Sequence, residues 1–247
     1  MSDARPGIKE IRASLSPEKR RADGPWTTFV LRPLSYPTAW LFIRLGFSPN
    51  AVTYLSALLC VAAFACLVAG SALCAWIGFG LFFIFGILDC VDGNMARVLK
   101  KTGPWGEWVD ALGGYVAYTT ILLAIGVASD ARSGAMLPGT GLALPWPTGG
   151  WTLVGGLAAS ANLLMRAVFQ NYRVVNRDHD RESVGGEKRL SETIGITGFL
   201  VPLAALAYGF GYLPWVALAY CIVYGGGCLL TLLKLIRSVE REIAGAK

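Results

Sequence analysis

Residues 89–115 read DCVDGNMARVLKKTGPWGEWVDALGGY and join two long apolar stretches of the chain. Each stretch is long enough to cross a bilayer as a helix, which takes about 20 residues. Glycine and proline within residues 103–106 favour a short turn between the two helices. The segment therefore predicts two antiparallel membrane helices that place acidic residues at the membrane–water boundary where they meet.

Three aspartates are expected to converge at this boundary. Asp89 and Asp92 share one helical face if the first helix continues to Arg97, and the turn brings Asp110 opposite them. Converging carboxylates repel one another unless cations hold them together, and hard divalent cations fit such oxygen ligands. Arginine is suited to phosphate oxygens, so the set predicts a site for a diphosphate. Small residues that leave room for such a ligand are Gly93, Ala96 and Gly106.

The composition of the whole chain indicates a membrane protein. Of the 247 residues, 54% are hydrophobic and only 15% are charged, and the mean hydropathy is +0.52, which is too apolar for a water-facing domain. Helices are expected because they satisfy backbone polar groups within the bilayer. We predict an all-α integral membrane protein with six transmembrane helices preceded by an amphipathic juxtamembrane helix. The expected spans are residues 52–70, 72–88, 108–128, 151–169, 194–209 and 213–236.

The distribution of charge predicts the topology. Lysine and arginine gather before the first expected span and after the second, fourth and sixth, whereas residues 129–150 contain only Asp130 and Arg132. By the positive-inside rule, both termini and the acidic cluster are cytoplasmic. The net charge of +6 is spread over these segments rather than along one stripe with interleaved aromatics, so we expect no nucleic-acid partner. Because the first 25 residues are polar, we expect no cleavable signal sequence there. We also expect a plasma membrane of the bacterial type.

The spacing of the acidic cluster resembles the signature of the CDP-alcohol phosphotransferases, also called CDP-alcohol phosphatidyltransferases. These are membrane enzymes of six helices that displace CMP from a CDP-linked donor. The position of the signature, at the end of the second span and the start of the third, is similar to that in the family. Residues 48–53, SPNAVT, resemble the entry to the family's first span. The matching signature residues are Asp89, Asp92, Gly93, Ala96, Arg97, Gly106 and Asp110.

The resemblance implies a transferase acting in phospholipid or head-group synthesis. It would move a phosphoryl-linked group from CDP-diacylglycerol or a CDP-alcohol to an alcohol or phosphate-bearing acceptor and release CMP. The resemblance also implies a homodimer surrounded by membrane lipids, and two divalent cations, Mg²⁺ or Mn²⁺, held by Asp89, Asp92 and Asp110. The CDP pocket would be lined by Asn50, Thr53, Gly93, Ala96, Arg97 and Gly106.

The sequence is expected to divide into four segments. Residues 1–24 are polar and are predicted to be a mobile or surface-lying cytoplasmic tail. Residues 25–47 mix aromatic and apolar residues with arginine, which is typical of a helix in the headgroup plane; this helix either only anchors the chain or also walls the active site. Residues 48–238 form the six-helix transmembrane catalytic domain, which begins with Ser48 as N-cap. Residues 239–247 are a cytoplasmic tail.

The fourth carboxylate of the family signature is missing. The family has an aspartate four residues after the third one, thought to take the proton of the attacking hydroxyl, and here that position is Gly114. Four explanations stay open. The acceptor is already anionic; another carboxylate substitutes; the chain is a catalytically impaired relative that binds a CDP-lipid or a partner protein; or Gly114 is a sporadic or engineered substitution that traps a substrate complex. The candidate substitutes are Glu107, Asp178, Glu182 and Glu187.

Two arginines near the end of the fourth expected span are candidates for binding an anionic acceptor. Arg166 and Arg173 present the planar fork that matches phosphate. The alternative is that they only extend to the lipid headgroups, as arginines at span ends commonly do.

Overall fold

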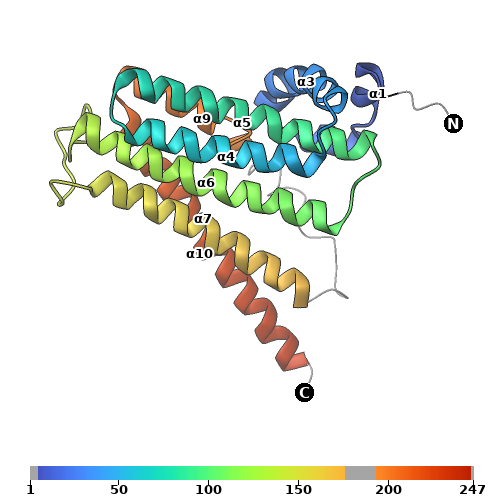
Figure 1. Cartoon of the computed structure of the whole chain (residues 1–247). Coiled ribbons are helices and arrows are strands. Elements are labelled where there is room, and N and C mark those ends of the chain that lie inside the picture. The colour runs from blue at the N-terminus through green and yellow to red at the C-terminus, as the bar shows by residue number, and fades with distance from the viewer. Residues whose placement is uncertain (1–4, 176–192, 246–247) are drawn as a thin grey trace. The chain divides into compact units, whose positions relative to one another are not determined.

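The computed structural model describes residues 5–175 and 193–245, with the side chains of 173–175 and 242–245 left out (Figure 1). The described residues form helices and no β-strand, apart from one isolated bridge between Met136 and Ala143. The helices are α1 (Ile8–Ala13), α2 (Pro17–Ala22), the π-helix η1 (Thr27–Leu31), α3 (Arg32–Arg44), α4 (Pro49–Val68), α5 (Ala72–Val98), α6 (Pro104–Ser133), α7 (Gly150–Val175), α9 (Leu200–Phe210) and α10 (Leu213–Gly245).

Five of these helices, α4, α5, α6, α7 and α10, are long and apolar enough to cross a membrane. This confirms the prediction of an all-α integral membrane protein. The span expected over residues 194–209 differs, because its regular part is α9, which has only 11 residues. Turns precede α9, where the amide of Gly198 donates to the carbonyl of Gly195 at 2.9 Å; glycine readily adopts such turns. The described part of the chain thus shows five helices of spanning length, and a sixth span stays a prediction.

The chain forms two compact units, which are described separately. The first is drawn from Met1–Ala117 and Val184–Ala205, and the second from Tyr118–Ser183 and Leu206–Lys247. All the aspartates of the signature lie in the first unit. The expected division into a tail, an interfacial helix and one transmembrane domain stays a prediction.

In the first unit, α4 and α5 pack side by side (Figure 1). Ser48 caps α4, accepting the amide of Ala51 at 3.2 Å, as predicted. Helix α5 extends past the expected span and ends where Lys100 adopts a left-handed conformation, with φ of 54°. The amide of Lys101 then donates to the carbonyl of Ala96 at 2.8 Å, which closes the helix end. Because α5 continues to Val98, the first two aspartates and Arg97 share one helix.

The N-terminal segment packs onto the first unit. Its polar residues form α1 and α2, and Ile11 of α1 is fully buried against Ala39 of α3 and Val91 of α5. Helix α3 packs on α5 and follows directly from η1. Pro33 and Pro37 in α3 lack backbone N–H groups. The amide of Arg32 donates to the carbonyl of Thr27, five residues earlier, and this spacing defines the π-helix η1. Within the segment expected to be a mobile or surface-lying tail, residues 8–22 therefore contain two short helices, of which α1 is anchored by the buried Ile11.

The second unit relies on close helix contact. Gly126 of α6 and Gly155 of α7 face each other, and a Cβ on Gly155 would meet the carbonyl oxygen of Leu122 and lie 3.1 Å from the Cα of Gly126. Asp130 of α6 accepts hydrogen bonds from the first amides of α7, at 3.0 Å from Trp151 and 2.7 Å from Thr152. Helix α10 packs along α7.

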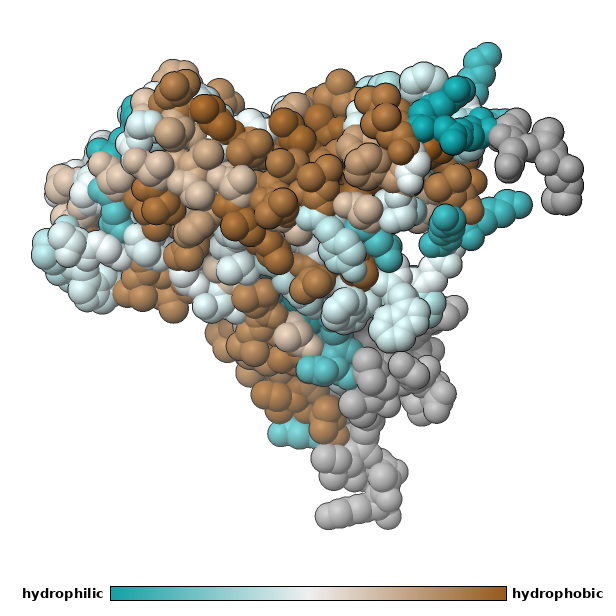
Figure 2. Space-filling model, in the orientation of Figure 1, coloured by the Kyte–Doolittle hydropathy of each residue, from teal (hydrophilic) through white to brown (hydrophobic). Residues whose placement is uncertain are grey.

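Apolar side chains are abundant on the surface of the long helices. In the view of Figure 2 hydrophobic residues cover the long helices, whereas hydrophilic residues gather around α1. On α4, Tyr54, Leu58 and Val61 are 55%, 65% and 49% exposed. Such a continuous apolar surface is typical of helices that face lipid.

Candidate active site

Asp92 is the most enclosed carboxylate of the predicted site. It lies on α5 and is only 5% exposed. Its Oδ2 accepts a 2.6 Å hydrogen bond from the Thr53 hydroxyl of α4, while the same hydroxyl lies 3.3 Å from the carbonyl oxygen of Pro49. A hydroxyl has one proton, so the shorter contact takes it. One hydroxyl does not neutralise a buried carboxylate, and the position is therefore suited to a cation.

Asp89 and Asp110 lie near Asp92. Asp89 is half-buried one turn earlier on α5, Asp110 is exposed on α6, and the charges of both act on Asp92. Their oxygens have the chemistry that Mg²⁺ and Mn²⁺ prefer. Among the described residues, however, no three acidic, histidine or cysteine side chains lie close enough together to bind one metal ion. The ligand chemistry of the three aspartates fits a metal ion, although their side chains do not form such a group in this structure.

Asn94 links α5 to α3 and holds Arg97. It is fully buried, and its Oδ1 accepts hydrogen bonds from Nη2 of Arg97 at 2.8 Å and from Nη1 of Arg32 at 3.2 Å. Its Nδ2 donates to the hydroxyl of Ser35 at 2.9 Å. The Nε of Arg97 is also buried but has no hydrogen-bond partner among the residues described. This donor is therefore available to a ligand oxygen.

Arg32 is itself fixed by Asp23. Its Nε and Nη2 donate to the two carboxylate oxygens of Asp23 at 2.7 and 3.0 Å, and both side chains are buried. Burial alone would lower the pKa of Arg32, but the hydrogen bonds and the charge of Asp23 raise that pKa above its ordinary value. Arg32 therefore stays charged. While paired with Asp23, it also donates a hydrogen bond to Asn94.

The glycines of the signature differ in what surrounds them. A Cβ on Gly93 would lie 3.2 Å from Nη1 of Arg97, so this glycine makes room for the guanidinium. Its expected place beside a ligand stays a prediction. A Cβ on Gly106 would meet no other described residue within 4 Å. Its place in a CDP pocket stays a prediction. A Cβ on Gly113 would lie 3.0 Å from the methyl group of Thr53, so this glycine lets α6 approach α4 beside Asp92.

The remaining predicted residues of this region lie at the same helix ends. Asn50 is half-buried in the first turn of α4, and Ala96 is half-buried on α5. Gly114 is half-buried on α6, one turn after Asp110. Glu107, the nearest candidate to replace the missing base, is exposed in the first turn of α6. Asp178, Glu182 and Glu187 lie outside the described residues.

The acceptor candidates belong to the second unit. The guanidinium of Arg166 lies over the ring of Tyr118, 4.4 Å from its centroid, and its Nε donates to Oδ1 of Asn162 at 3.1 Å. Arg173 is in α7, but its side chain is not among those described. A role for either arginine in acceptor binding stays a prediction.

Sequence reasoning missed the residues that position Arg97. Asn94 stands at a position for which the signature specifies no residue. Arg32 and Ser35 precede it by 62 and 59 residues. One signal was present: Arg32 and Ser35 fall on the same helical face as the buried Ala39 and Ile43. Polar residues on a buried face point to a partner. The contact favours the interpretation that this element also walls the site.

Comparison with known proteins agrees with the geometry. No curated protein matched the chain. A family model described as CDP-alcohol phosphatidyltransferase matches residues 47–225, which is more than half of the chain and includes α4, α5, α6 and α7. Members of that family transfer phosphate-linked groups from CDP-alcohol donors. The match begins one residue before the cap of α4 and includes the buried aspartate and its threonine partner. The chain belongs to the CDP-alcohol phosphatidyltransferase family.

Proposed function

We propose that the chain transfers a phosphoryl-linked group from a CDP-activated donor, such as CDP-diacylglycerol or a CDP-alcohol, to an alcohol or anionic acceptor and releases CMP. The observation that carries this assignment to the described site is the buried Nε of Arg97, which has no hydrogen-bond partner among the residues that the structure describes, while Asn94 holds the same guanidinium. A fixed guanidinium with a spare donor suits a phosphate oxygen. The reaction belongs to phospholipid or head-group synthesis.

Divalent cations complete the proposed site. Asp89, Asp92 and Asp110 would hold two ions, Mg²⁺ or Mn²⁺. When bound, such ions neutralise charge on the diphosphate and on the departing CMP. The protein itself contributes by fixing Asp92 through its hydrogen bond with Thr53 and by keeping that carboxylate away from bulk water. The proposed CDP pocket is lined by Asn50, Thr53, Gly93, Ala96, Arg97 and Gly106.

Gly114 favours a second candidate function. A glycine at this place on α6 offers no proton acceptor, so an alcohol acceptor needs another base, whereas an anionic acceptor needs none. Glu107 is exposed on the same helix and is the described candidate for such a base. The second candidate is a catalytically impaired relative that binds a CDP-lipid or a partner protein.

We also propose a placement in the membrane. Residues 25–47 lie in the headgroup plane, α9 with its flanking residues completes six spans, and both termini and the acidic site face the cytoplasm of a plasma membrane of the bacterial type. The exposed apolar residues Phe29, Leu34 and Leu41 support the interfacial position of α3 and η1. The protein is proposed to be a homodimer.

CMP release from the purified protein in lipid nanodiscs tests the function. CDP-diacylglycerol is supplied with a panel of hydroxyl and phosphate acceptors and either Mg²⁺ or Mn²⁺, and the unaltered chain is compared with Asp92→Asn and Gly114→Asp. We expect turnover by the unaltered chain and its loss, by at least about 100-fold, in Asp92→Asn, because this variant removes a proposed metal ligand.

The other outcomes discriminate between the candidates. Turnover only after Gly114→Asp, or CMP binding without turnover in either protein, would support the impaired relative. Failure of CMP and of CDP-diacylglycerol to bind any of these proteins would overturn both the transferase and a relative that binds a CDP-lipid.

A further inference from the structure

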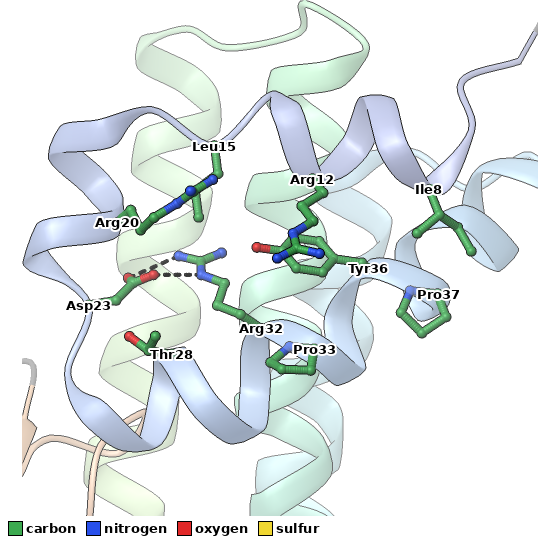
Figure 3. A pocket seen from close by; sticks show the side chains of 10 residues that line it. All are labelled: Ile8, Arg12, Leu15, Arg20, Asp23, Thr28, Arg32, Pro33, Tyr36 and Pro37. Carbon is green, nitrogen blue, oxygen red and sulfur yellow. Dashed lines mark hydrogen bonds and ion pairs between the residues drawn. The ribbon is translucent and has the colours of Figure 1, made fainter.

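A pocket of about 370 Å³ lies among the N-terminal helices, and all its lining residues fall within residues 8–37 (Figure 3). Three arginines reach into it from three helices: Arg12 from α1, Arg20 from α2 and Arg32 from α3. None of the proposed metal ligands or CDP-binding residues lines it. The pocket is therefore a separate feature from the proposed active site.

The lining of this pocket carries excess positive charge. Arg32 is neutralised by Asp23, which it contacts through two hydrogen bonds. The guanidinium groups of Arg12 and Arg20 form no salt bridge or hydrogen bond within residues 5–175 and 193–245. Three arginines and one aspartate leave two uncompensated positive charges among the lining residues. Two unpaired arginines in one pocket favour a ligand with a phosphate group.

Buried anchors fix the helices that carry these arginines. Ile11 is fully buried and Leu15 is 4% exposed, which holds α1 against the first unit. The hydroxyl of Ser16 accepts the amide of Lys19 at 3.2 Å and so caps α2. Asp23, directly after α2, is tied to Arg32. Arg12 and Arg20 therefore belong to helices that are anchored in the first unit.

Apart from the hydroxyl-bearing Thr28 and Tyr36, the remaining lining is apolar, and it adjoins an exposed apolar surface. Ile8, Pro33 and Pro37 line the pocket. Next to them on the same helical run, Leu34 is 42% exposed and Phe29 is 78% exposed. A phosphate site beside exposed apolar side chains matches an amphiphile, whose phosphate and hydrocarbon parts are joined.

We propose that this pocket binds an anionic membrane phospholipid. Arg12 and Arg20 donate to its phosphate oxygens, and the apolar wall contacts the glycerol end of its acyl chains. This lipid is neither the CDP donor nor the acceptor, and no bond is made or broken in the pocket. The inference goes beyond the proposed function but rests on the proposed placement of residues 25–47 in the headgroup plane.

The test is lipid binding by the purified full chain in detergent, followed by native mass spectrometry and by thermal stabilisation. The probes are short-chain phosphatidylglycerol, short-chain phosphatidylcholine, glycerol 3-phosphate and inorganic phosphate. The double variant Arg12→Gln/Arg20→Gln is compared with Lys9→Gln/Arg21→Gln, which removes the same charge from exposed positions of α1 and α2 that do not line the pocket. We expect phosphatidylglycerol to bind about tenfold more weakly to the first variant only.

Each alternative result would overturn the inference. Equal weakening in both variants would show that only net charge attracts the lipid. Equal binding of phosphatidylcholine would show that the charge of the lipid is not read. Binding of glycerol 3-phosphate or inorganic phosphate as tight as that of the lipid would identify a soluble ligand instead. CMP release, measured in the same preparations, separates these outcomes from a failure of the proposed enzymatic function.

Discussion

Arg97 belongs to the family signature, and Asn94, which stands at an unspecified position within that signature, holds it in place. Asn94 accepts hydrogen bonds from Arg97 and Arg32 with one oxygen and donates to Ser35 with its nitrogen. Because Asn94, Arg32 and Ser35 are buried and Arg97 is half-buried, loss of the amide leaves two arginine donors without this partner. The position of this guanidinium, which we propose binds the diphosphate, thus depends on α3, which lies about 60 residues earlier in the chain.

Replacement of Asn94 tests this dependence at the residue scale. A hydrogen bond to a charged group contributes about 1.5–3 kcal/mol, so Asn94→Leu is expected to raise KM for the CDP donor at least about tenfold, with a smaller change in kcat. Asn94→Asp keeps oxygen acceptors for both arginines and should retain more affinity than Asn94→Leu. Steady-state kinetics of CMP release provide the measurement.

The matched control for this prediction is Asn171→Leu, an exposed position of α7. It should leave KM unchanged. A loss that falls on kcat alone, or equal losses in Asn94→Asp and Asn94→Leu, would contradict a positioning role for this side chain.

At the scale of elements, helix contacts in the second unit depend on glycine where backbones meet. A Cβ on Gly155 would run into the carbonyl oxygen of Leu122 and the backbone of Gly126, neither of which can turn aside. The neighbouring Gly156 is different, because its Cβ would lie 3.9 Å from a methyl group of Leu123, an ordinary contact. The two glycines therefore form a natural pair for comparison.

Gly155→Ala should separate α6 from α7 and destabilise the protein by about 1–3 kcal/mol. In a chain of this size, a loss of that order lowers Tm by at least about 2–4 °C. Gly156→Ala should be neutral or stabilising, because alanine favours a helix by up to about 1 kcal/mol over glycine. Thermal unfolding in detergent measures both, and an equal shift for the two variants would be inconsistent with close backbone contact at Gly155.

Helices and their caps could be predicted from the sequence, whereas contacts between distant helices could not. The pair α5–α6 was predictable because apolar length and a Gly-Pro turn are local signals, and the cap at Ser48 is equally local. The contact between Arg32 and Asn94 was not, because it depends on how α3 packs on α5. The expected span over residues 194–209 failed to appear as one long helix because hydropathy counts apolar residues but does not weigh the turn that starts at Gly195.

For the whole molecule, the proposed chemistry divides between the two units. Every proposed metal-binding and nucleotide-binding residue lies between Asn50 and Asp110 in the first unit, whereas Arg166 lies in the second. The first unit also contains the network that joins Asp23 to Arg97 through α3. A ligand that engages only the nucleotide site should therefore stabilise the first unit selectively.

Hydrogen–deuterium exchange with CMP and Mg²⁺ measures this selectivity. Since a bound ligand slows opening of the elements it contacts, we expect slower exchange at the C-terminal end of α5, the first turns of α6 and in α3. Exchange in α7 and α10 should be unchanged. Asp92→Asn should abolish the protection if it depends on the metal site, whereas Asn171→Leu should preserve it. Protection spread evenly over both units would contradict a nucleotide site confined to the first, and protection retained in Asp92→Asn would place the nucleotide elsewhere than at the buried carboxylate.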